Sequence, residues 1–232
     1  MNVLIGVGAQ VKLARLMLTT DTRSGRGDLG PFLEAAVTGG VDLVQIREPG
    51  LDHDAELAAL RTAWDVASRH RHLVVVSDSD RLAADFGADV VELSCPGNAA
   101  ELADFKSRLG RFTRLGVNAD DAGQLERLLA EPAVDFVLVA ATDGLALAAA
   151  AARRSPVAEL SSKPWYAAGE FTPERLEDAI EVGVRRIAVS RTLTEAADPH
   201  AVARRLSRRL REVWSTDPEL TRFTFAALAE QT

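Results

Sequence analysis

Several short apolar runs of this 232-residue chain end in polar side chains that could bind a charged ligand. In the stretch DLVQIREPG, Gln45, Arg47 and Glu48 follow such a run, and Pro49-Gly50 then ends it. Other runs end in Ser77, Asp78, Asn118, Gly169, Ser190 and Arg191. If the runs are parallel strands, their carboxyl ends meet at one edge, and the charges there predict the binding of a polar ligand.

A five-residue pattern that recurs four times along the chain indicates how these runs are positioned. It starts at Gly40, Gly87, Ala133 and Gly183, so successive copies begin 47, 46 and 50 residues apart. Each copy follows a helix-like segment, and glycine is the residue that most often ends a helix in the left-handed conformation. The pattern therefore predicts helix ends that lead directly into strands.

Four further apolar runs precede the copies, one before each, at 15–19, 73–76, 115–117 and 165–168. Together they make eight strand candidates, and amphipathic helical segments separate most of them, for example at 54–68, 98–109, 121–130, 173–182 and 199–213. Continuous apolar strands alternating with helices are typical of parallel strands buried on both faces. We therefore predict an α/β fold, a (β/α)8 TIM barrel, with an open doubly wound sheet as the alternative.

The composition argues against several classes of function. The formal net charge of -7 is unfavourable for nucleic-acid or anionic-membrane binding, which calls for a basic surface. No apolar run approaches the roughly 20 residues that span a bilayer. Cys95 is the single cysteine, so no intrachain disulfide forms, which is consistent with a cytoplasmic protein. Because no histidine follows a strand candidate to activate Cys95, we expect an ordinary, nearly buried thiol.

Four stretches carry a resemblance to a known family: GRGDLGPFLEAAVTGGVDLVQIRE, VVVSDSDRLAADFGADVVEL, KPWYAAGEFTPERLEDAIEVGVRRIAVSRTL and ADPHAVARRL. These four stretches occur in the order found in the thiamine phosphate synthase family, from about Ala14 to about Leu210. The chain therefore resembles that family. Related thiazole tautomerases share the superfamily, but the position of their catalytic histidine corresponds roughly to Asp120 here.

The resemblance implies a Mg²⁺-dependent transferase of thiamine biosynthesis. Such an enzyme joins a hydroxymethyl-pyrimidine diphosphate to a thiazole phosphate and releases diphosphate. The implied substrate-binding residues are Gln45, Arg47, Ser77, Asn118, Gly169, Ser190 and Arg191. Arg47 and Asp78 are the implied catalytic residues, and Asp78 is the implied Mg²⁺ ligand.

The chain departs from the family pattern at several of its motifs. Pro49 stands where the family has a lysine, and Gly97 stands where it has a second metal-binding aspartate. The family's V-H-L-G-Q run reads V-E-L-S-C here, at 91–95, and the loop at 140–144 lacks the family's lysine. Glu170 replaces the second glycine of a Gly-Gly turn that binds phosphate through backbone N–H groups. The resemblance is thus to the family as a divergent member.

The predicted mouth of the barrel is acidic, which leaves more than one function open. The carboxylates are Glu48, Asp78, Glu92, Asp143 and Glu170, against Arg47 and Arg191. One hypothesis is an active synthase. The second is a catalytically degenerate paralogue that binds a phosphorylated ligand or a protein partner without turnover. A third is a different metal-dependent reaction of the surplus carboxylates. Two structural roles also compete: an ion pair between Arg47 and Glu48, and a helix N-cap role for Asp78.

The ends of the chain extend beyond the predicted barrel. We expect an N-terminal extension at residues 1–13, the barrel at 14–213, and a helical tail at 214–232. Leu220, Phe223, Phe225 and Leu228 make the tail too apolar for a disordered end. The tail either docks on the barrel or contacts another subunit, so a homo-oligomer stays an alternative.

Overall fold

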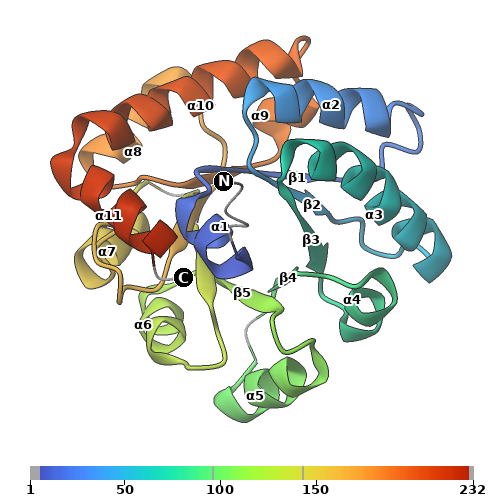
Figure 1. The fold of residues 1–232 in the computed structure, drawn as a ribbon, viewed down its shortest axis with the longest axis horizontal. Helices are drawn as coiled ribbons and strands as arrows, with labels where there is room; N and C mark the ends of the chain where they lie inside the picture. Colours follow the sequence, from blue (N-terminus) through green and yellow to red (C-terminus); the bar gives the residue numbers. More distant parts are fainter. Residues whose placement is uncertain (1–5, 96, 143, 230–232) are drawn as a thin grey trace.

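The chain folds into a closed barrel of eight parallel strands, in the order β1 to β8 around the ring (Figure 1). The computed structural model describes residues 6–95, 97–142 and 144–229. The strands are β1 Leu16–Thr20, β2 Leu43–Ile46, β3 Leu73–Ser77, β4 Val90–Leu93, β5 Arg114–Ala119, β6 Phe136–Ala140, β7 Trp165–Ala168 and β8 Ile187–Val189. The predicted TIM barrel is confirmed, and the open sheet is wrong.

Helices surround the ring, one or more after each strand (Figure 1). They are α2 Leu29–Gly39, α3 His53–Ala67 with the 3-10 turn η1 Ser68–His70, α4 Asp80–Phe86, α5 Ala99–Arg108, α6 Ala122–Ala130, α7 Ala146–Arg154, α8 Pro173–Glu181, α9 Arg191–Thr194, α10 Pro199–Thr216 and α11 Pro218–Ala229. Gly40, Gly87 and Gly183 follow helices with φ of 112°, 75° and 97°. The predicted helix-ending role of these glycines is confirmed, because this left-handed region strains residues with a Cβ.

The N-terminal segment closes the bottom of the barrel. Helix α1 (Val7–Leu13) lies across the N-terminal ends of the strands (Figure 1). Inside the ring, the hydroxyl of the buried Tyr166 donates to the Val11 carbonyl at 2.6 Å. Arg186 is fully buried and donates to the Lys12 carbonyl from Nε at 3.0 Å and from Nη2 at 2.6 Å. Residues 7–13 are therefore an integral part of the barrel core.

The tail helix α11 docks on the same end of the barrel. Trp214, Leu220, Phe223 and Ala227 form a buried cluster, in which the Trp214 and Phe223 rings meet edge to face at 5.9 Å. The guanidinium of Arg186 lies 5.3 Å from the centre of the Trp214 ring. The first of the two predicted roles of the tail, docking on its own barrel, is therefore observed.

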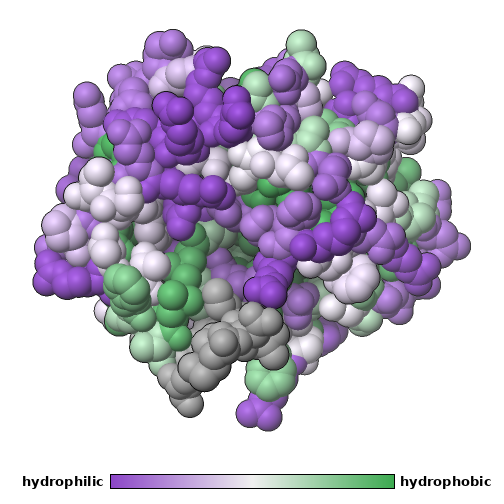
Figure 2. All heavy atoms as spheres, turned by 45° about the horizontal axis from the view of Figure 1, so that its top comes forward, coloured by the Kyte–Doolittle hydropathy of each residue, from purple (hydrophilic) through white to green (hydrophobic). Residues whose placement is uncertain are grey.

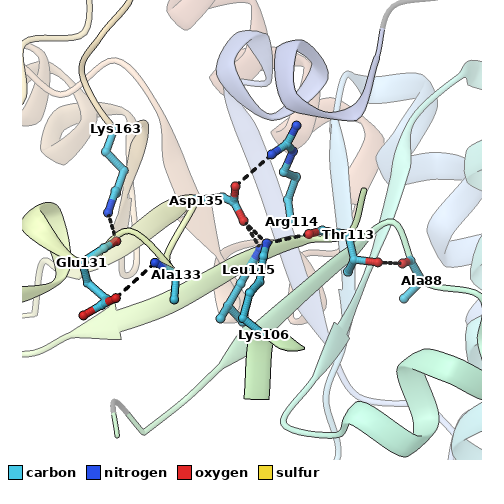
Figure 3. A network of polar contacts seen from close by, with 9 residues as sticks. All are labelled: Ala88, Lys106, Thr113, Arg114, Leu115, Glu131, Ala133, Asp135 and Lys163. Atoms are coloured by element: carbon cyan, nitrogen blue, oxygen red, sulfur yellow. Dashed lines mark hydrogen bonds and ion pairs between the residues drawn. The ribbon is translucent and has the colours of Figure 1, made fainter. Parts of the chain in front are cut away.

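A polar network fixes the neighbouring strands β5 and β6 at this N-terminal end (Figure 3). The Asp135 carboxylate accepts from the Leu115 amide at 2.8 Å and from Arg114 Nη1 at 3.0 Å. Lys106 also pairs with Asp135, and its Nζ donates to the Thr113 carbonyl at 2.7 Å. Because these charges lie at the opposite end from the predicted ligand site, we assign them to strand pairing.

The surface over α10 is mostly polar. Figure 2 shows hydrophilic side chains over much of the face that α10 presents. Along this helix Arg204, Arg205 and Arg208 are exposed, whereas Leu206 and Leu210 are buried. The amphipathic helix predicted at 199–213 is thus confirmed. Among the described residues, no helix combines the length and apolar character that crossing a membrane requires.

We predict that Gly116→Ala destabilises the barrel interior. A Cβ at position 116 would lie 2.2 Å from Cζ of Phe136 on the neighbouring strand, and both residues are buried. Overpacking of this kind costs about 2 kcal/mol in the free energy of unfolding. Urea denaturation of the single variants and of Gly116→Ala combined with Phe136→Leu measures the coupling. The double variant should recover part of the loss; strictly additive losses would contradict a clash between these two residues.

Candidate active site

A cavity of about 350 Å³ opens at the carboxyl ends of the strands. Its lining residues are Thr19, Gln45, Arg47, Glu92, Asn118, Asp120, Leu138, Ala140, Thr142, Ala168, Gly169, Glu170, Ala188, Val189 and Ser190. Five of the predicted site residues are among them, and they come from β2, β5, β7 and β8 or directly follow these strands. Parallel strands bring them together although up to 145 positions separate Gln45 from Ser190 along the chain.

A chain of hydrogen bonds orients the buried amide of Gln45 at the bottom of this cavity. Thr19 Oγ1 donates to Gln45 Oε1 at 2.7 Å, and Gln45 Nε2 donates to Ser77 Oγ at 2.9 Å and to Glu92 Oε2 at 2.6 Å. The Ser77 hydroxyl donates in turn to the Ile46 carbonyl at 3.1 Å. Since the Ser77 proton is committed to Ile46, its oxygen must accept from Gln45, which determines the orientation of the amide.

Glu92 is the most perturbed carboxyl group of the cavity. It is 1% exposed, and burial raises its pKa to about 7, with a further contribution from the negative charge of Asp78. The hydrogen bond from Gln45 and the charge of Arg47 oppose this shift. Glu92 Oε1 is buried without a hydrogen-bond partner in the described part of the chain, and so is Asn118 Oδ1. Two acceptors in this cavity therefore lack donors.

Asp78 stands at the rim, directly after β3. Its amide donates to the Glu92 carbonyl at 2.9 Å, and its carboxylate accepts from the Ser94 amide at 2.7 Å and from Ser94 Oγ at 2.6 Å. Its φ of 55° lies in the left-handed region, which non-glycine residues adopt rarely and most often near functional sites. Ser79, whose Oγ accepts from the Leu82 amide, is the N-cap of α4. The N-cap alternative for Asp78 is wrong.

Arg47 and Glu48 have different partners. Arg47 Nε lies 3.9 Å from Asp78 Oδ2, and the Arg47 side chain is 39% exposed. Glu48 accepts from the Thr22 amide at 3.0 Å and from the Thr22 hydroxyl, and these hydrogen bonds lower its pKa. Both side chains are described and no ion pair joins them, so the predicted alternative of a capping ion pair is wrong. Arg47 faces the cavity as a cation beside Asp78.

The carboxylate of Glu170 accepts hydrogen bonds from the segment that follows β8. It accepts from the Thr192 amide at 2.6 Å, from Thr192 Oγ1 at 2.7 Å and from the Arg191 amide at 3.3 Å. Arg191 Nε lies 3.6 Å from the same carboxylate. The Gly169 amide donates to the Ala188 carbonyl at 3.0 Å within the barrel wall. The Glu170 carboxylate thus binds the same donors of Arg191 and Thr192 that a phosphate could use.

Arg175 is a cation at the mouth that the sequence analysis missed. It lies in the first turn of α8 and donates from Nη2 to the Ala141 and Thr142 carbonyls at the end of β6. Thr142 lines the cavity, so the guanidinium lies beside it. A signal was present in the sequence, because the first turn of a helix that follows a barrel strand lies at the catalytic face.

Other predictions for the mouth have mixed outcomes. Cys95 is exposed, so the expectation of a nearly buried thiol is wrong; it lies in the loop after β4, outside the barrel wall. Asp143 lies outside the described residues. Across residues 6–95, 97–142 and 144–229, no three side chains of His, Cys, Asp or Glu are grouped to hold a metal ion.

Comparisons with known proteins agree on one family. A family profile described as thiamine monophosphate synthase matches residues 16–193. The chain is 36% identical over 214 residues to the thiamine-phosphate synthase of Mycolicibacterium smegmatis, a match covering 84% of this chain and 91% of that protein. The corresponding match to the thiamine-phosphate synthase of Thermobifida fusca is 36% over 211 residues, covering 87% and 94%. A solved structure, thiamine phosphate pyrophosphorylase from Pyrococcus furiosus, shares the fold with a TM-score of 0.71 and 21% identity, over 88% of this chain and 98% of that one.

We predict that Glu92 makes the stability of the protein depend on pH. Its pKa is about 7 in the folded state against an ordinary value of 4.5, so folding favours the protonated carboxyl group. The stabilisation is complete below about pH 4.5 and is lost as the pH rises through 7; at about 1.4 kcal/mol per pKa unit it amounts to about 3 kcal/mol.

Urea denaturation of the wild type and of Glu92→Gln at about pH 5 and pH 8 isolates this contribution, because other groups titrate alike in both proteins. The wild type should lose more stability than the variant between the two values. Parallel pH profiles would show that Glu92 titrates normally.

Proposed function

Because the chain belongs to the thiamine monophosphate synthase family, we propose that it acts in thiamine biosynthesis and joins a hydroxymethyl-pyrimidine diphosphate to a thiazole phosphate with release of diphosphate. The observation that carries the proposal is the cavity at the carboxyl ends of the strands, where Gln45, Arg47 and Asn118 meet. Ligand sites of TIM barrels lie at this end in essentially every characterised enzyme. Family membership and the position of the cavity support the same activity.

The pyrimidine ring would occupy the deep part of the cavity in this proposal. Asn118 Oδ1 and the second lone pair of Gln45 Oε1 supply acceptors, and Ser77 supports Gln45 from below. The diphosphate would extend toward the rim, where Arg47 is half-exposed. Arginine binds phosphate oxygens in a forked geometry, and a cation beside the departing diphosphate stabilises the charge that develops there. Arg175 supports this side of the mouth in place of the lysine that the loop at 140–144 lacks.

Asp78 fits the role of a Mg²⁺ ligand. Its side chain is 46% exposed, and the two hydrogen bonds from Ser94 leave lone pairs free on both carboxylate oxygens. Mg²⁺ is commonly held by one or two carboxylates, with water and substrate phosphates completing its shell. When bound, the ion would neutralise charge on the departing diphosphate.

The thiazole phosphate would lie near Gly169, Ser190 and Arg191 in the same proposal. TIM barrels frequently bind phosphate with the loops after strands seven and eight and a short extra helix, and α9 is such a helix here. Glu170 already accepts hydrogen bonds from this segment. A phosphate must therefore displace the Glu170 carboxylate or bind beside it.

The non-catalytic alternative differs from the synthase in one measurable property, turnover. The relatives carry the name of the enzyme, which supports the synthase. The proposal also includes a cytoplasmic location, consistent with a single cysteine, and small phosphorylated substrates as the ligands. A homo-oligomer stays a prediction.

We predict that the purified protein forms thiamine phosphate from the two substrates with Mg²⁺, and that Asp78→Ala abolishes this turnover. Loss of a charged group that stabilises the departing diphosphate costs at least about a hundredfold in kcat. Asp78→Asn is the conservative variant, since asparagine tolerates the positive φ while the negative charge is lost. Mass spectrometry of the reaction mixture detects the product.

Asp65→Ala, which removes an exposed carboxylate on α3, is the matched control and should keep wild-type turnover. Full activity of both Asp78 variants would remove Asp78 as the Mg²⁺ ligand. If the wild type makes no product beside a family member that is active under the same conditions, the non-catalytic alternative holds.

We further predict that Glu170→Gly strengthens phosphate binding. The substitution frees the amides of Arg191 and Thr192, the Thr192 hydroxyl and the Arg191 guanidinium, all of which now face the carboxylate. The KM for thiazole phosphate should fall about tenfold, because charge-assisted hydrogen bonds of this kind are each worth about 1.5 kcal/mol or more.

Glu195→Gly is the control, because Glu195 is exposed near the same segment and carries the same charge. An unchanged KM in Glu170→Gly would show that phosphate binds elsewhere.

A further inference from the structure

Two buried oxygen atoms in the cavity have no hydrogen-bond donor among the described residues. They are Glu92 Oε1 and Asn118 Oδ1, from the adjacent strands β4 and β5. Both residues line the cavity, and Glu92 is 1% exposed. A buried acceptor without a donor is costly, typically by about 1–3 kcal/mol, so these atoms indicate a ligand that supplies N–H groups.

The side chains of the hydrogen-bond chain around Gln45 cannot supply these donors. Both hydrogens of the Gln45 amide are committed, one to Ser77 Oγ and one to Glu92 Oε2. The hydroxyl hydrogens of Thr19 and Ser77 are committed to Gln45 Oε1 and to the Ile46 carbonyl. The deep part of the cavity thus presents acceptors, and its orientation is determined by the hydrogen-bond chain from Thr19 to Glu92.

Strands β6, β7 and β8 contribute a wall of aliphatic side chains below the rim. They are Leu138, Ala140, Ala168, Ala188 and Val189. Small aliphatic side chains at one wall and polar atoms at the other suit a flat aromatic ring with a polar edge. Such a ring would direct its edge toward Glu92 and Asn118.

We propose that Glu92 is a specificity-determining residue, and that Glu92 Oε1 and Asn118 Oδ1 together accept hydrogen bonds from an amino group attached to a flat heteroaromatic ring. The inference rests on the proposed function, in which that ring is the pyrimidine. It assigns selectivity to a carboxylate that replaces the histidine of the family's V-H-L-G-Q run. A ring with a carbonyl in place of the amino group would set its oxygen against two acceptors and be rejected.

The test compares two ligands without diphosphate, the hydroxymethyl-aminopyrimidine alcohol and its oxo analogue. Isothermal titration calorimetry measures the affinity of the protein for each ligand. The wild type should bind the amino ligand at least about tenfold more tightly than the oxo ligand.

Glu92→Gln gives the sharpest contrast. Gln45 Nε2 donates toward position 92, so the new amide must turn its oxygen to Gln45 and its NH₂ group to the cavity. The preference for the amino ligand should then disappear or reverse. Asn118→Leu provides a second variant, in which the preference should shrink while Glu92 is intact.

Glu126→Gln is the matched control, because it makes the same change on the exposed face of α6 and should keep the wild-type preference. Circular dichroism verifies that each variant is folded. Equal binding of both ligands by the wild type, an unchanged preference in Glu92→Gln, or no binding of either ligand would each overturn the inference.

Turnover is measured separately with the phosphorylated substrates. Thiamine phosphate formation without an amino preference overturns only the inference. An amino preference that depends on Glu92, without turnover, supports the inference and overturns the proposed synthase activity.

Discussion

Closure of the eight-stranded ring is the constraint on which the other features of the molecule depend. Strand β8 pairs with β1, and the Ile187 amide donates to the Arg15 carbonyl at 2.9 Å, so the sheet has no free edge. Because all strands are parallel, every carboxyl end faces one rim. Gln45, Glu92 and Asn118 therefore reach one cavity. The other end of the ring needs a cover, which α1 provides through the buried Tyr166 and Arg186.

The mouth of the barrel is less repulsive to anions than its formal charges suggest. Glu48 is held by Thr22, Asp78 lies beside Arg47, and Glu170 is bound by the segment that follows β8. Each of these three carboxylates thus has a local hydrogen-bond donor or cation beside it. Glu92 differs, because among the described residues it is the carboxyl group that keeps an oxygen buried and unpartnered. The unpaired carboxylate oxygen of the cavity therefore lies deep inside it, away from the rim.

Departures from the family pattern are accommodated by neighbouring residues. At position 97, a Cβ would lie 2.6 Å from Glu101 Oε2, because Glu101 folds back to form a capping box with Asn98 at the start of α5. An aspartate there would require this helix start to rearrange. At the end of β6, Arg175 reaches the carbonyls of a loop that has no lysine.

The sequence by itself determined the barrel and the set of polar residues at its rim. The periodicity of apolar residues in strands and helices is a local property of the sequence. Glycines such as Gly40 and Gly87 end their helices independently of the fold that follows. Gln45, Arg47 and Asn118 could thus be predicted as neighbours from their positions after strands. Contacts between loops could not be predicted: Arg175 reaches the Ala141 and Thr142 carbonyls of another βα unit, and the pairing of Glu170 with Thr192 depends on how two loops meet. Only the tertiary structure decided that Glu92 keeps one oxygen without a donor, because burial and hydrogen-bond saturation arise from side chains that many residues separate.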